Sequence, residues 1–546
     1  MINVKNLTKE YNGTTVLDEL SFYIGARDKV AIVGANGVGK STLLRILAGV
    51  ALPDGGKVEY DGDKPSIGFL LQELTAIEDV TIRDYVRKET GIESIAAQMQ
   101  LLEYELEDPK KLEAYGDLQS LFLRLDGYAF ENNMKKTLDG LGLTNIALDR
   151  ALSTLSGGQK SKVQLTAILL KGVDVIILDE PTNNLDLPAL IWLEQFIQET
   201  SATCVMVSHD RAFLDSVVTK VFEIDWEKRS IIKHNTGYTE YLDFKAKELF
   251  RLKELYQQQQ EEIGELKESI NLKKNAVNRS GGKAKDNDKL IRNFKAENSS
   301  NQSAKQARQL EKRIEQMDKV EKPKERALIK IEIDASLAMR KHEINFDKVA
   351  YQYPDGFGLT DVNLSLPFGK KIGIYGANGS GKSTLLKLIS GVLQPNSGAI
   401  NIGHTIVMGN LMQAHEDLPH ELSLLEFLKS KNTHFEKSEV YHLLHLFGFE
   451  VDEYEKSISK LSPGGRARLI MASFSLEKVN TLILDEPTNH MDVEAIDALI
   501  ELLNNFSGMV ILVSHDRNFI KSVHPEINYL VEGGRLRHIN SYTDMF

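Results

Sequence analysis

An internal repeat is the feature that most constrains how this chain can fold. The segment VAIVGANGVGKSTLLRILAGV at residues 30–50 recurs as IGIYGANGSGKSTLLKLISGV at residues 372–392, an offset of 342 positions. Two later segments, ILDEPTNNLD at residues 177–186 and VSHDR at residues 207–211, recur as ILDEPTNHMD and VSHDR with an offset of 306 positions. A repeat of this length and order predicts two homologous domains in one chain.

The fall in offset from 342 to 306 indicates that the first copy carries about 36 additional residues in its middle. Gln72 and Gln413 are still 341 positions apart, which places the extra sequence after them, at about residues 84–127. This region contains IESIAAQMQLLEYEL and KKLEAYGDLQSLFLRL, both with apolar residues at helical spacing. We predict an inserted helical arm of two helices, with Pro109 at the turn or opening the second helix.

The segment between the copies predicts a helical hairpin. Its first half has apolar residues at strict seven-residue intervals, typical of a coiled-coil-like seam: Leu242, Leu249, Tyr256, Ile263 and Ile270. Its return half has apolar residues at alternating steps of three and four: Ala307, Leu310, Ile314 and Met317. We therefore expect a first domain at residues 1–240, a linker at residues 241–325 and a second domain at residues 326–546.

The expected tip of this hairpin, at about residues 271–310, is basic in an acidic chain. It contains ten Lys or Arg and three Asp or Glu, whereas the whole chain has a net charge of −12. A solvated charged hairpin is one interpretation, but the reversal of sign favours a surface that faces a polyanion. Phe294 beside Arg292 and Lys295 is an arrangement often found at RNA contacts. The candidate RNA contacts are Lys273, Lys274, Arg279, Lys283, Lys285, Arg292 and Lys295.

Composition sets limits on compartment and chemistry. Cys204 is the only cysteine, which excludes an intramolecular disulfide and a zinc site built on several thiolates. No run approaches the roughly 18–20 consecutive apolar residues of a membrane-spanning helix. The start MINVKNLTKEY lacks the apolar region of a secretory signal. We expect a cytoplasmic protein without a membrane partner.

Both copies of the repeated block contain a phosphate-binding loop (P-loop). GANGVGKS at residues 34–41 and GANGSGKS at residues 376–383 fit G-x-x-x-x-G-K-[ST], between a strand-like apolar run and a helix start. In such a loop the backbone N–H groups surround phosphates, the lysine contacts the β- and γ-phosphates, and the hydroxyl binds Mg²⁺. The candidate phosphate ligands are Gly34, Asn36, Gly37, Gly39, Lys40, Ser41 and Thr42, and in the second copy Gly376, Asn378, Gly379, Gly381, Lys382, Ser383 and Thr384.

Each copy also contains an apolar strand that ends in two carboxylates. These are Asp179 and Glu180 in the first copy and Asp485 and Glu486 in the second. An aspartate in this place fits the Mg²⁺ side of a P-loop nucleoside triphosphatase. The glutamate that follows fits the residue that orients or deprotonates the attacking water.

Histidine and tyrosine pairs complete the candidate sites. His209 and His515 each follow their aspartate by 30 residues. A core histidine is the default for either alone, but the shared context favours contact with a γ-phosphate. Tyr11 and Tyr353 each precede the first P-loop glycine by 23 residues and could stack on adenine, with a core tyrosine as the alternative.

These motifs, in this order, resemble the ATP-binding cassette (ABC) family over essentially the whole chain. The family's signature loop LSGGQ stands at residues 155–159 and is altered to LSPGG at residues 461–465. The resemblance implies that two cassettes close head-to-tail on two ATP molecules with Mg²⁺. Each ATP lies between one P-loop and the signature loop of the other cassette. It adds as ATP ligands Ser156, Gly157, Gly158, Gln159, Ser462 and Gly464, and adds Gln72 and Gln413 as ligands of both ATP and Mg²⁺.

Fused cassettes, an inserted arm and a long linker resemble one subgroup, class F (ABC-F). EPTNHMD at residues 486–492 is close to the EPTNHLD of that class, whereas the first copy has Asn184 where His is usual. The resemblance implies a monomeric ATPase whose cassettes pair within the chain. It would bind the E site of the 50S ribosomal subunit and reach rRNA and the P-site tRNA with its linker. Some class F proteins are translation factors and others confer antibiotic resistance, and the sequence leaves both open.

Two other classes of ATPase are alternatives. The ATPase subunit of a membrane transporter needs a membrane partner, and a basic coiled-coil-like linker has no explanation there. A DNA-repair ATPase is favoured by longer coiled coils with zinc cysteines, which a single cysteine and a linker of about 85 residues do not provide.

The altered signature loop predicts two unequal ATP sites. Pro463 removes one backbone N–H donor and restricts φ, and Gly465 lacks the side-chain amide of Gln159. By the family's arrangement this change falls on the ATP held by Lys40. We therefore expect faster hydrolysis at the site that contains Glu486.

Overall fold

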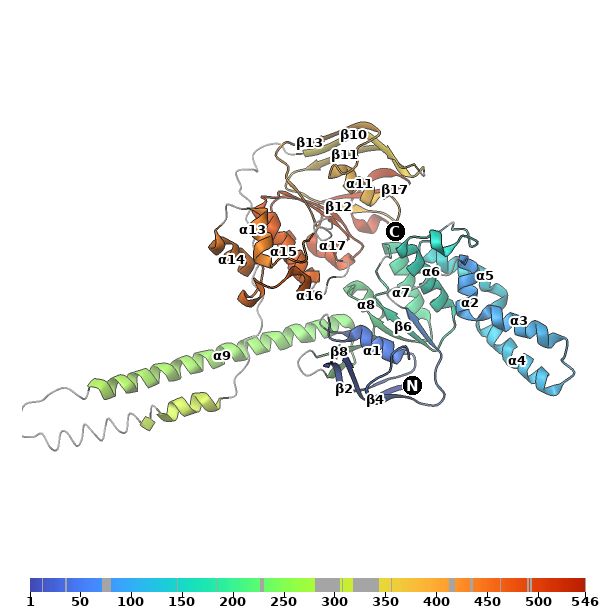
Figure 1. Ribbon diagram of the computed structural model, residues 1–546, viewed down its shortest axis with the longest axis horizontal. Helices are drawn as coiled ribbons and strands as arrows, with labels where there is room; N and C mark the ends of the chain where they lie inside the picture. Colours follow the sequence, from blue (N-terminus) through green and yellow to red (C-terminus); the bar gives the residue numbers. More distant parts are fainter. Residues whose placement is uncertain are drawn as a thin grey trace, which may run out of the picture. The chain divides into compact units, whose positions relative to one another are not determined.

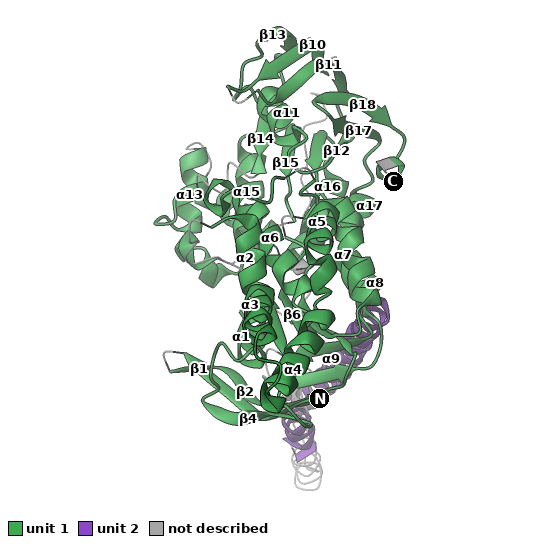
Figure 2. Ribbon diagram, turned by 90° about the vertical axis from the view of Figure 1, so that its right-hand side faces the viewer, with its two compact units in different colours: residues 1–238, 327–546 green, residues 239–326 purple. Residues whose placement is uncertain are grey.

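The computed structural model describes most of the 546 residues. The residues left outside the description are 12, 35–36, 71–79, 145, 184, 226–229, 280–304, 307, 318–342, 355, 412–417, 433–435, 462, 489–490, 492 and 546. The side chains of residues 273–279, 463–464, 493–494 and 545 are also outside it. The described chain forms two compact units (Figure 2): residues 1–238 with 327–546, and residues 239–326.

The first domain is built on a six-stranded sheet in the order β5-β6-β7-β3-β8-β9, in which only β9 is antiparallel to its neighbour. Buried apolar runs such as VIILD and TCVMV form its central strands, as expected for parallel strands covered on both faces. The strands of this sheet are β3 Lys29–Val33, β5 Ile67–Leu70, β6 Val175–Asp179, β7 Thr203–Val207, β8 Lys220–Ile224 and β9 Ile231–His234.

A second, three-stranded antiparallel sheet packs its apolar face on the same core (Figure 1). Its order is β2-β1-β4, from β1 Ile2–Tyr11, β2 Thr14–Ile24 and β4 Gly55–Tyr60. The helices of this domain are α1 Lys40–Leu47, α2 Ile82–Thr90, α3 Ile92–Glu103, α4 Pro109–Arg124, α5 Phe130–Gly140, α6 Gly157–Leu170, α7 Leu187–Glu199 and α8 Arg211–Val217.

The second domain repeats this plan. Its six-stranded sheet has the order β14-β15-β16-β12-β17-β18 and its three-stranded sheet the order β11-β10-β13. The strands are β10 Glu343–Gln352, β11 Gly358–Pro367, β12 Lys371–Tyr375, β13 Ser397–Ile402, β14 Met408–Asn410, β15 Thr481–Asp485, β16 Met509–Val513, β17 Ile527–Glu532 and β18 Arg535–Ile539. The helices are α11 Lys382–Ile389, α13 Leu424–Lys431, α14 Lys437–Leu446, α15 Pro463–Leu476, α16 Val493–Asn505 and α17 Arg517–Val523. The expectation of two tandem α/β P-loop domains is confirmed.

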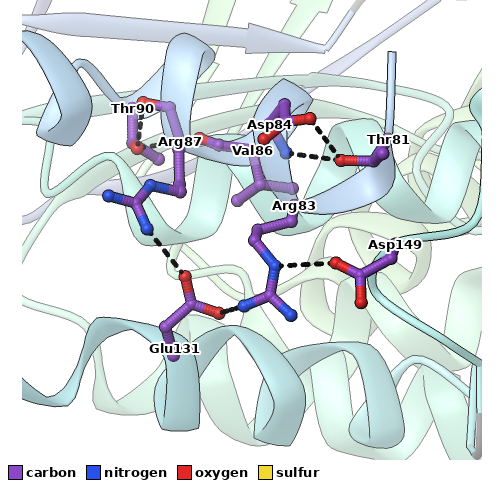
Figure 3. Close-up of polar contacts among 8 residues, drawn as sticks. All are labelled: Thr81, Arg83, Asp84, Val86, Arg87, Thr90, Glu131 and Asp149. Carbon is purple, nitrogen blue, oxygen red and sulfur yellow. Dashed lines mark hydrogen bonds and ion pairs between the residues drawn. The ribbon is translucent and has the colours of Figure 1, made fainter.

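Helices α3 and α4 lie within the segment where the inserted arm is expected, and Pro109 is the first residue of α4. A cluster of ion pairs ties α2, which leads into this arm, to α5, which follows it (Figure 3). Arg83 pairs with Glu131 and, through its Nε at 3.1 Å, with Asp149. Arg87 Nη1 lies 3.1 Å from the same Glu131. Because this pairing joins both flanks of the insertion, it fixes the base from which the two arm helices project.

The linker unit contains the 42-residue helix α9, Tyr238–Arg279, and a second helical segment at residues 308–316. Arg313 Nη2 on the second segment lies 2.8 Å from Glu262 Oε1 on α9, so the two run side by side there. Helix α9 continues past residue 271 because NLKKNAVNR contains neither Gly nor Pro. The rest of the expected tip, from residue 280 to 304, lies outside the described residues. No helix among the described residues is both long and apolar enough to cross a membrane.

Candidate functional site

The two P-loops have the same local geometry. Each connects a buried central strand, β3 or β12, to the first residue of a helix, Lys40 of α1 or Lys382 of α11. The residue before that lysine is Gly39 with φ of 102° or Gly381 with φ of 112°, values that side-chain-bearing residues rarely adopt. A Cβ on Gly39 would lie 2.7 Å from Leu17 Cδ2, so conformation and space both require glycine.

The lysines fold back over their own loops. Lys40 Nζ donates to the carbonyl oxygen of Gly34 at 2.9 Å. Lys382 Nζ donates to Gly376 O at 2.8 Å and to Ala377 O at 3.0 Å. Burial lowers the pKa of Lys382 although the nearby carboxylates, led by Glu486, oppose this. A buried ammonium held against the carbonyl oxygens of a P-loop is well placed to bind an anion such as a phosphate.

The carboxylates stand at the ends of the neighbouring strands, β6 and β15. Ser383 Oγ donates to Asp485 Oδ2 at 2.8 Å, and Ser41 makes the same bond to Asp179. Asp179 Oδ1 is buried without a hydrogen-bond partner among the described residues, and burial raises the pKa of this carboxyl. A hydroxyl paired with a carboxylate that keeps a free buried oxygen fits Mg²⁺, which prefers oxygen ligands. These two serine–aspartate pairs therefore suit the Mg²⁺ ion that a P-loop nucleotide site requires.

Glu180 and Glu486 follow these aspartates with φ of 50° and 48°, in the left-handed region. Glu180 Oε2 accepts from the backbone N–H of His209 at 3.3 Å, and Glu486 Oε2 from that of His515 at 3.2 Å. The other oxygen of each, Oε1, is buried without a hydrogen-bond partner in the described part of the chain. Burial, reinforced by the adjacent aspartate, raises the pKa of each glutamate to about 7. A carboxylate with a pKa near neutrality can accept a proton from water.

The imidazole rings lie beside these glutamates. His209 Nε2 is 3.4 Å from Glu180 Oε1, and His515 Nε2 is 3.3 Å from Glu486 Oε1. Burial and the charge of Lys382 lower the pKa of His515 to about 3, so this ring is neutral at pH 7. A neutral imidazole at this place can donate one N–H to a phosphate oxygen without adding charge.

The two signature loops each begin a helix. Ser156 caps α6 by accepting from Gln159 N–H at 3.3 Å, while Gln159 Oε1 accepts from Ser156 N–H at 3.1 Å. The side-chain oxygen of Gln159 thus bonds within the loop itself. In the second domain, α15 begins at Pro463, a position where the missing N–H has no partner within the helix anyway. Ser462 lies outside the described residues, and the backbone of Gly464 lies in α15.

The structure brings one signature loop and the opposite P-loop to the same cavity, of about 400 Å³. From the first domain it is lined by Ser156, Gly158, Gln159, Lys162, Glu180 and His209, and from the second by Asn378, Gly379, Glu486 and His515, among others. The N–H of Asn378 donates to Asp186 Oδ2 of the first domain at 2.8 Å. A further cavity of about 400 Å³ is lined by the first P-loop, including Gly37, Gly39, Lys40, Ser41 and Thr42, with Asp179, Glu180 and His209.

Several predicted site residues are absent from the linings of these two cavities or lie outside the described residues. Tyr11 ends β1 and is 45% exposed, and Tyr353 follows β10 and stacks on Phe357. Asn36, Gln72, Gln413 and Ser462 are outside the described residues, as are Lys283, Lys285, Arg292 and Lys295. Lys273, Lys274 and Arg279 belong to α9, but their side chains are not described.

Sequence reasoning missed several residues that lie at these cavities or pair the two domains. Asp186 stands in the duplicated NNLD segment, and Lys162 follows the first signature loop. Arg211 Nη2 lies 2.7 Å from Asp497 of the other domain, and Arg517 pairs with Glu194. Both arginines belong to the duplicated VSHDR segment, so the repeat itself was the available signal.

Two α/β domains, each with a P-loop, a magnesium-type aspartate and a buried glutamate, define a P-loop nucleoside triphosphatase with duplicated sites. The profile of the family described as ABC transporter matches residues 17–183 and 359–489. The chain is 32% identical to the ATP-binding protein YdiF of Bacillus subtilis, over 96% of this chain and 79% of that protein. It is 31% identical to ABC transporter F family member 5 of Arabidopsis thaliana, over 97% and 74% respectively.

A third relative is the tylosin resistance ATP-binding protein TlrC of Streptomyces fradiae, 32% identical over 94% of each chain. The fold is also that of the archaeal ribosome recycling factor aABCE1, solved in complex with the stalk protein aP1. That likeness has a TM-score of 0.59 at 19% identity, covering 99% of this chain and 91% of the other. The chain belongs to the ABC-F family of ATP-binding cassette ATPases. The expected resemblance and ATPase activity are thereby confirmed.

Proposed function

We propose that this ATPase acts on the ribosome. It binds the E site of the 50S subunit and places the linker tip near rRNA and the P-site tRNA. The observation that carries this is helix α9, whose 42 residues leave the first domain and lead into a basic segment. A helix of that length extends about 60 Å at 1.5 Å per residue. Positive charge at the end of such an extension suits a phosphate-rich partner.

The two nucleotide sites are the switch in this proposal. One ATP lies between Lys382, Asp485 and Glu486 and the signature loop that contains Ser156 and Gly158. The other lies between Lys40, Asp179 and Glu180 and the loop that contains Ser462 and Gly464. The cavity shared by the first signature loop and the second P-loop supports the first assignment. ATP binding then closes the two domains for docking, and hydrolysis drives release.

Ribosome co-sedimentation tests the switch. The variant Glu180→Gln with Glu486→Gln keeps the side-chain shape but removes the base, which typically costs about 10²–10⁴ in rate. With ATP and Mg²⁺ it should accumulate on ribosomes well above the level seen with ADP. The matched control is Glu199→Gln with Glu532→Gln, two exposed glutamates, which should sediment like the parent chain. Equal sedimentation of the catalytic double variant with ATP and with ADP would refute the proposal.

The similarity to TlrC makes antibiotic protection one form of this function, beside a general role in translation. The comparison that separates them is the drug susceptibility of cells with and without the protein. A protection factor should raise the inhibitory concentration of a ribosome-targeting drug, and the catalytic double variant should not. A translation factor should leave susceptibility unchanged but alter growth or polysome profiles.

A further inference from the structure

One buried cation of the first domain stands at the second nucleotide site. Lys162 belongs to α6, shortly after the first signature loop, and only 4% of its surface is exposed. It lines the cavity shared with the second P-loop, where it is the only lysine or arginine among the described lining residues. Its ammonium has no hydrogen-bond partner in the described part of the chain. A buried charge of this kind requires an opposite charge nearby.

The opposite charge is the carboxylate of Asp186. A Cβ built on Gly142 would lie 3.2 Å from Lys162 Nζ and 3.3 Å from Asp186 Oδ1, so both groups border the space that this glycine leaves empty. Gly142 has φ of 76°, a conformation that favours glycine. Burial lowers the pKa of Lys162, and the charge of Asp186 opposes this. The two buried charges therefore compensate each other across Gly142.

Asp186 in turn joins the two domains. Only 2% of its surface is exposed. Its Oδ1 accepts from Ala189 N–H at 3.4 Å, which caps α7 of the first domain. Its Oδ2 accepts from the backbone N–H of Asn378 at 2.8 Å. A carboxylate of the first domain thus holds a backbone group of the second P-loop.

The charges of this pair extend to the groups of the second site. Burial and the charge of Lys382 lower the pKa of His515. Asp186 opposes this shift, and Lys162 adds to it. The same two residues act in the same directions on Lys382, whose pKa burial lowers. Lys162 and Asp186 therefore stand close enough to the second site for their charges to influence it.

The equivalent cation of the second domain is bound differently. Arg468 Nη1 donates to Gly448 O at 2.8 Å and to Phe447 O at 3.2 Å, within its own domain. Its guanidinium carbon lies 4.8 Å from the ring centroid of Phe449. Leu143 replaces Phe449 in the first domain and provides no such ring. The loop after α14 therefore holds the arginine, whereas the corresponding loop of the first domain leaves the lysine facing the cavity.

We propose that Lys162 is a positioning residue of the second nucleotide site and acts on it from the opposite domain. Its charge stabilises the carboxylate of Asp186 at the domain contact, and this carboxylate fixes the backbone of Asn378. The second P-loop then has its working geometry when the two domains pair. Lys162 itself does not contact the nucleotide in this inference, which rests on the proposed assignment of ATP to the site of Lys382 and Glu486.

The test isolates turnover at the second site in the full-length chain. The parent carries Glu180→Gln, so that steady-state phosphate release comes from the site of Glu486. Lys162→Met removes the charge but keeps the length of the side chain, which leaves the carboxylate of Asp186 buried without compensation. The value of kcat/KM for ATP should fall by about tenfold or more. Lys162→Arg keeps the charge and should retain most of the parental value.

A double-mutant cycle shows whether the effect passes through Asp186. Asp186→Asn alone should also lower kcat/KM, because it removes the charge that faces the ammonium. The double variant with Lys162→Met should lose little more than either single variant, because only one interaction is lost. Lys171→Met, at the far end of α6, is the matched control and should keep the parental value. Melting temperatures are measured for every variant, and kcat/KM is compared among those that are folded at the assay temperature.

The outcomes separate this inference from the proposed function. If the Glu180→Gln parent releases no phosphate, the assignment of turnover to the site of Glu486 is wrong, and this inference is overturned with it. If the parent is active and Lys162→Met keeps the parental kcat/KM, the positioning role of Lys162 alone is overturned. Equal losses in Lys162→Met and Lys162→Arg would also overturn it, because shape rather than charge would then decide the effect.

The cycle gives a further way to contradict the inference. If the losses of Lys162→Met and Asp186→Asn multiply in the double variant, the two residues act independently and the inference is overturned. If Lys162→Met alone does not fold, the double variant carries the test, because its pair is neutral. It should then be at least as active as Asp186→Asn, and a further loss would overturn the inference.

Discussion

At the residue scale, Glu180 and Glu486 occupy the same uncommon turn in both domains. Each has φ near 50° directly after the last residue of a buried strand. Such a conformation costs about 1–3 kcal/mol for a residue other than glycine, and it persists only where the surroundings impose it. Here the backbone N–H of His209 or His515 donates to one carboxylate oxygen, and the other oxygen faces the imidazole of the same histidine. The strained backbone therefore positions a carboxylate whose pKa burial has raised to about 7, a value that suits the proposed role as a base.

The two glutamates should contribute unequally to turnover. Glu486→Gln should reduce steady-state phosphate release more than Glu180→Gln, because in the proposed assignment the ATP beside Glu486 faces the unaltered loop with Gln159. Restoring the other loop by Pro463→Gly with Gly465→Gln, in the Glu486→Gln chain, should raise the residual rate. The converse change, Gly157→Pro with Gln159→Gly, serves as its control and should lower the rate of the parent. A larger loss from Glu180→Gln than from Glu486→Gln would contradict the asymmetry.

At the element scale, α8 and α17 connect the two domains through the arginine that begins each helix. Arg517 Nη1 lies 3.4 Å from Glu194 Oε2 on α7, and Arg211 pairs with Asp497 on α16. The acids differ in exposure: the side chain of Glu194 is 9% exposed and that of Asp497 is 41% exposed. Breaking a buried pair leaves an uncompensated charge, whereas an exposed pair contributes about 0–1 kcal/mol.

Arg517→Gln should therefore lower the melting temperature more than Arg211→Gln. The free energy of unfolding should fall by about 2–4 kcal/mol in Arg517→Gln. This is less than the full cost of breaking a buried ion pair, because the side chain of Arg517 is partly exposed. Burial raises the pKa of Glu194 and its bond to Arg517 opposes this, so the unpaired carboxyl should become easier to protonate. Adding Glu194→Gln to Arg517→Gln should recover part of the stability. Equal melting temperatures for the two arginine variants would show that burial does not decide the effect.

The carboxylates that cap these same helices predict a pH dependence of stability. Asp516 Oδ1 accepts from Phe519 N–H at 3.0 Å, and Asp210 Oδ1 accepts from Phe213 N–H at 2.9 Å. Burial raises the pKa of Asp516 to about 7, the charge of Asp210 adds to this, and Arg211 opposes it. The folded chain then binds a proton that the unfolded chain releases near pH 4. The free energy of unfolding should fall as pH rises from about 4 to 7 and level off above, by at most about 1.4 kcal/mol per pH unit.

Asp516→Asn is the variant that checks this dependence, because Asn also caps helices well. Chemical denaturation between pH 5 and pH 8 should give a flatter profile for Asp516→Asn than for the parent. Asp117→Asn, on the exposed surface of α4, should reproduce the parental profile. A parental profile that rises with pH across this interval would contradict the assigned direction.

At the scale of the whole molecule, the charge of the chain is divided between an acidic bulk and a basic segment, residues 271–310, that begins in the last turns of α9. If that segment contacts ribosomal phosphates, neutralising its cations should weaken ribosome binding most at low salt. Each lost contact should reduce the slope of log affinity against log salt by about 0.7–0.9. The variant replaces Lys273, Lys274, Arg279, Lys283 and Lys285 by Gln, and binding is measured by sedimentation across a salt series.

The control for this experiment removes the same number of cations from the surface of the two domains. Suitable exposed residues are Lys64, Lys135, Lys136, Lys460 and Lys521. This control should change the salt slope much less than the variant in the linker. An unchanged slope in the linker variant would show that the basic segment does not contact phosphate.

The repeat explains why so much of the fold could be predicted. Gly34, Gly39 and Lys40 belong to a motif that favours the P-loop conformation. The same motif recurs at Gly376, Gly381 and Lys382, which makes a chance match to the motif improbable. The continuous apolar runs of β6 and β15 predict buried parallel strands for the same local reason. Helix α15, which contains Arg466 and Arg468, begins at Pro463, within the predicted second signature loop at residues 461–465.

The pairs that join the domains could not be predicted, because nothing local specifies them. Arg211 and Arg517 occupy equivalent positions of the repeat. Their partners Glu194 and Asp497 do not, because they stand about one helical turn apart on α7 and α16 when the two copies are aligned. The stacking of Phe357 on Tyr353 likewise depends on tertiary detail, the turn at Gly356 in which Tyr353 N–H donates to Phe357 O.

The sequence by itself determined the duplicated P-loop architecture, the ATPase chemistry and the altered second signature loop, because each depends on residues within a few positions of one another. Only the tertiary structure decided which side chains meet across the domains and which carboxylates are buried enough to have a raised pKa. It also decided that Phe357 stands beside the second P-loop and Val16 beside the first. Those features depend on packing between segments far apart in the chain, where burial and distance set the energies.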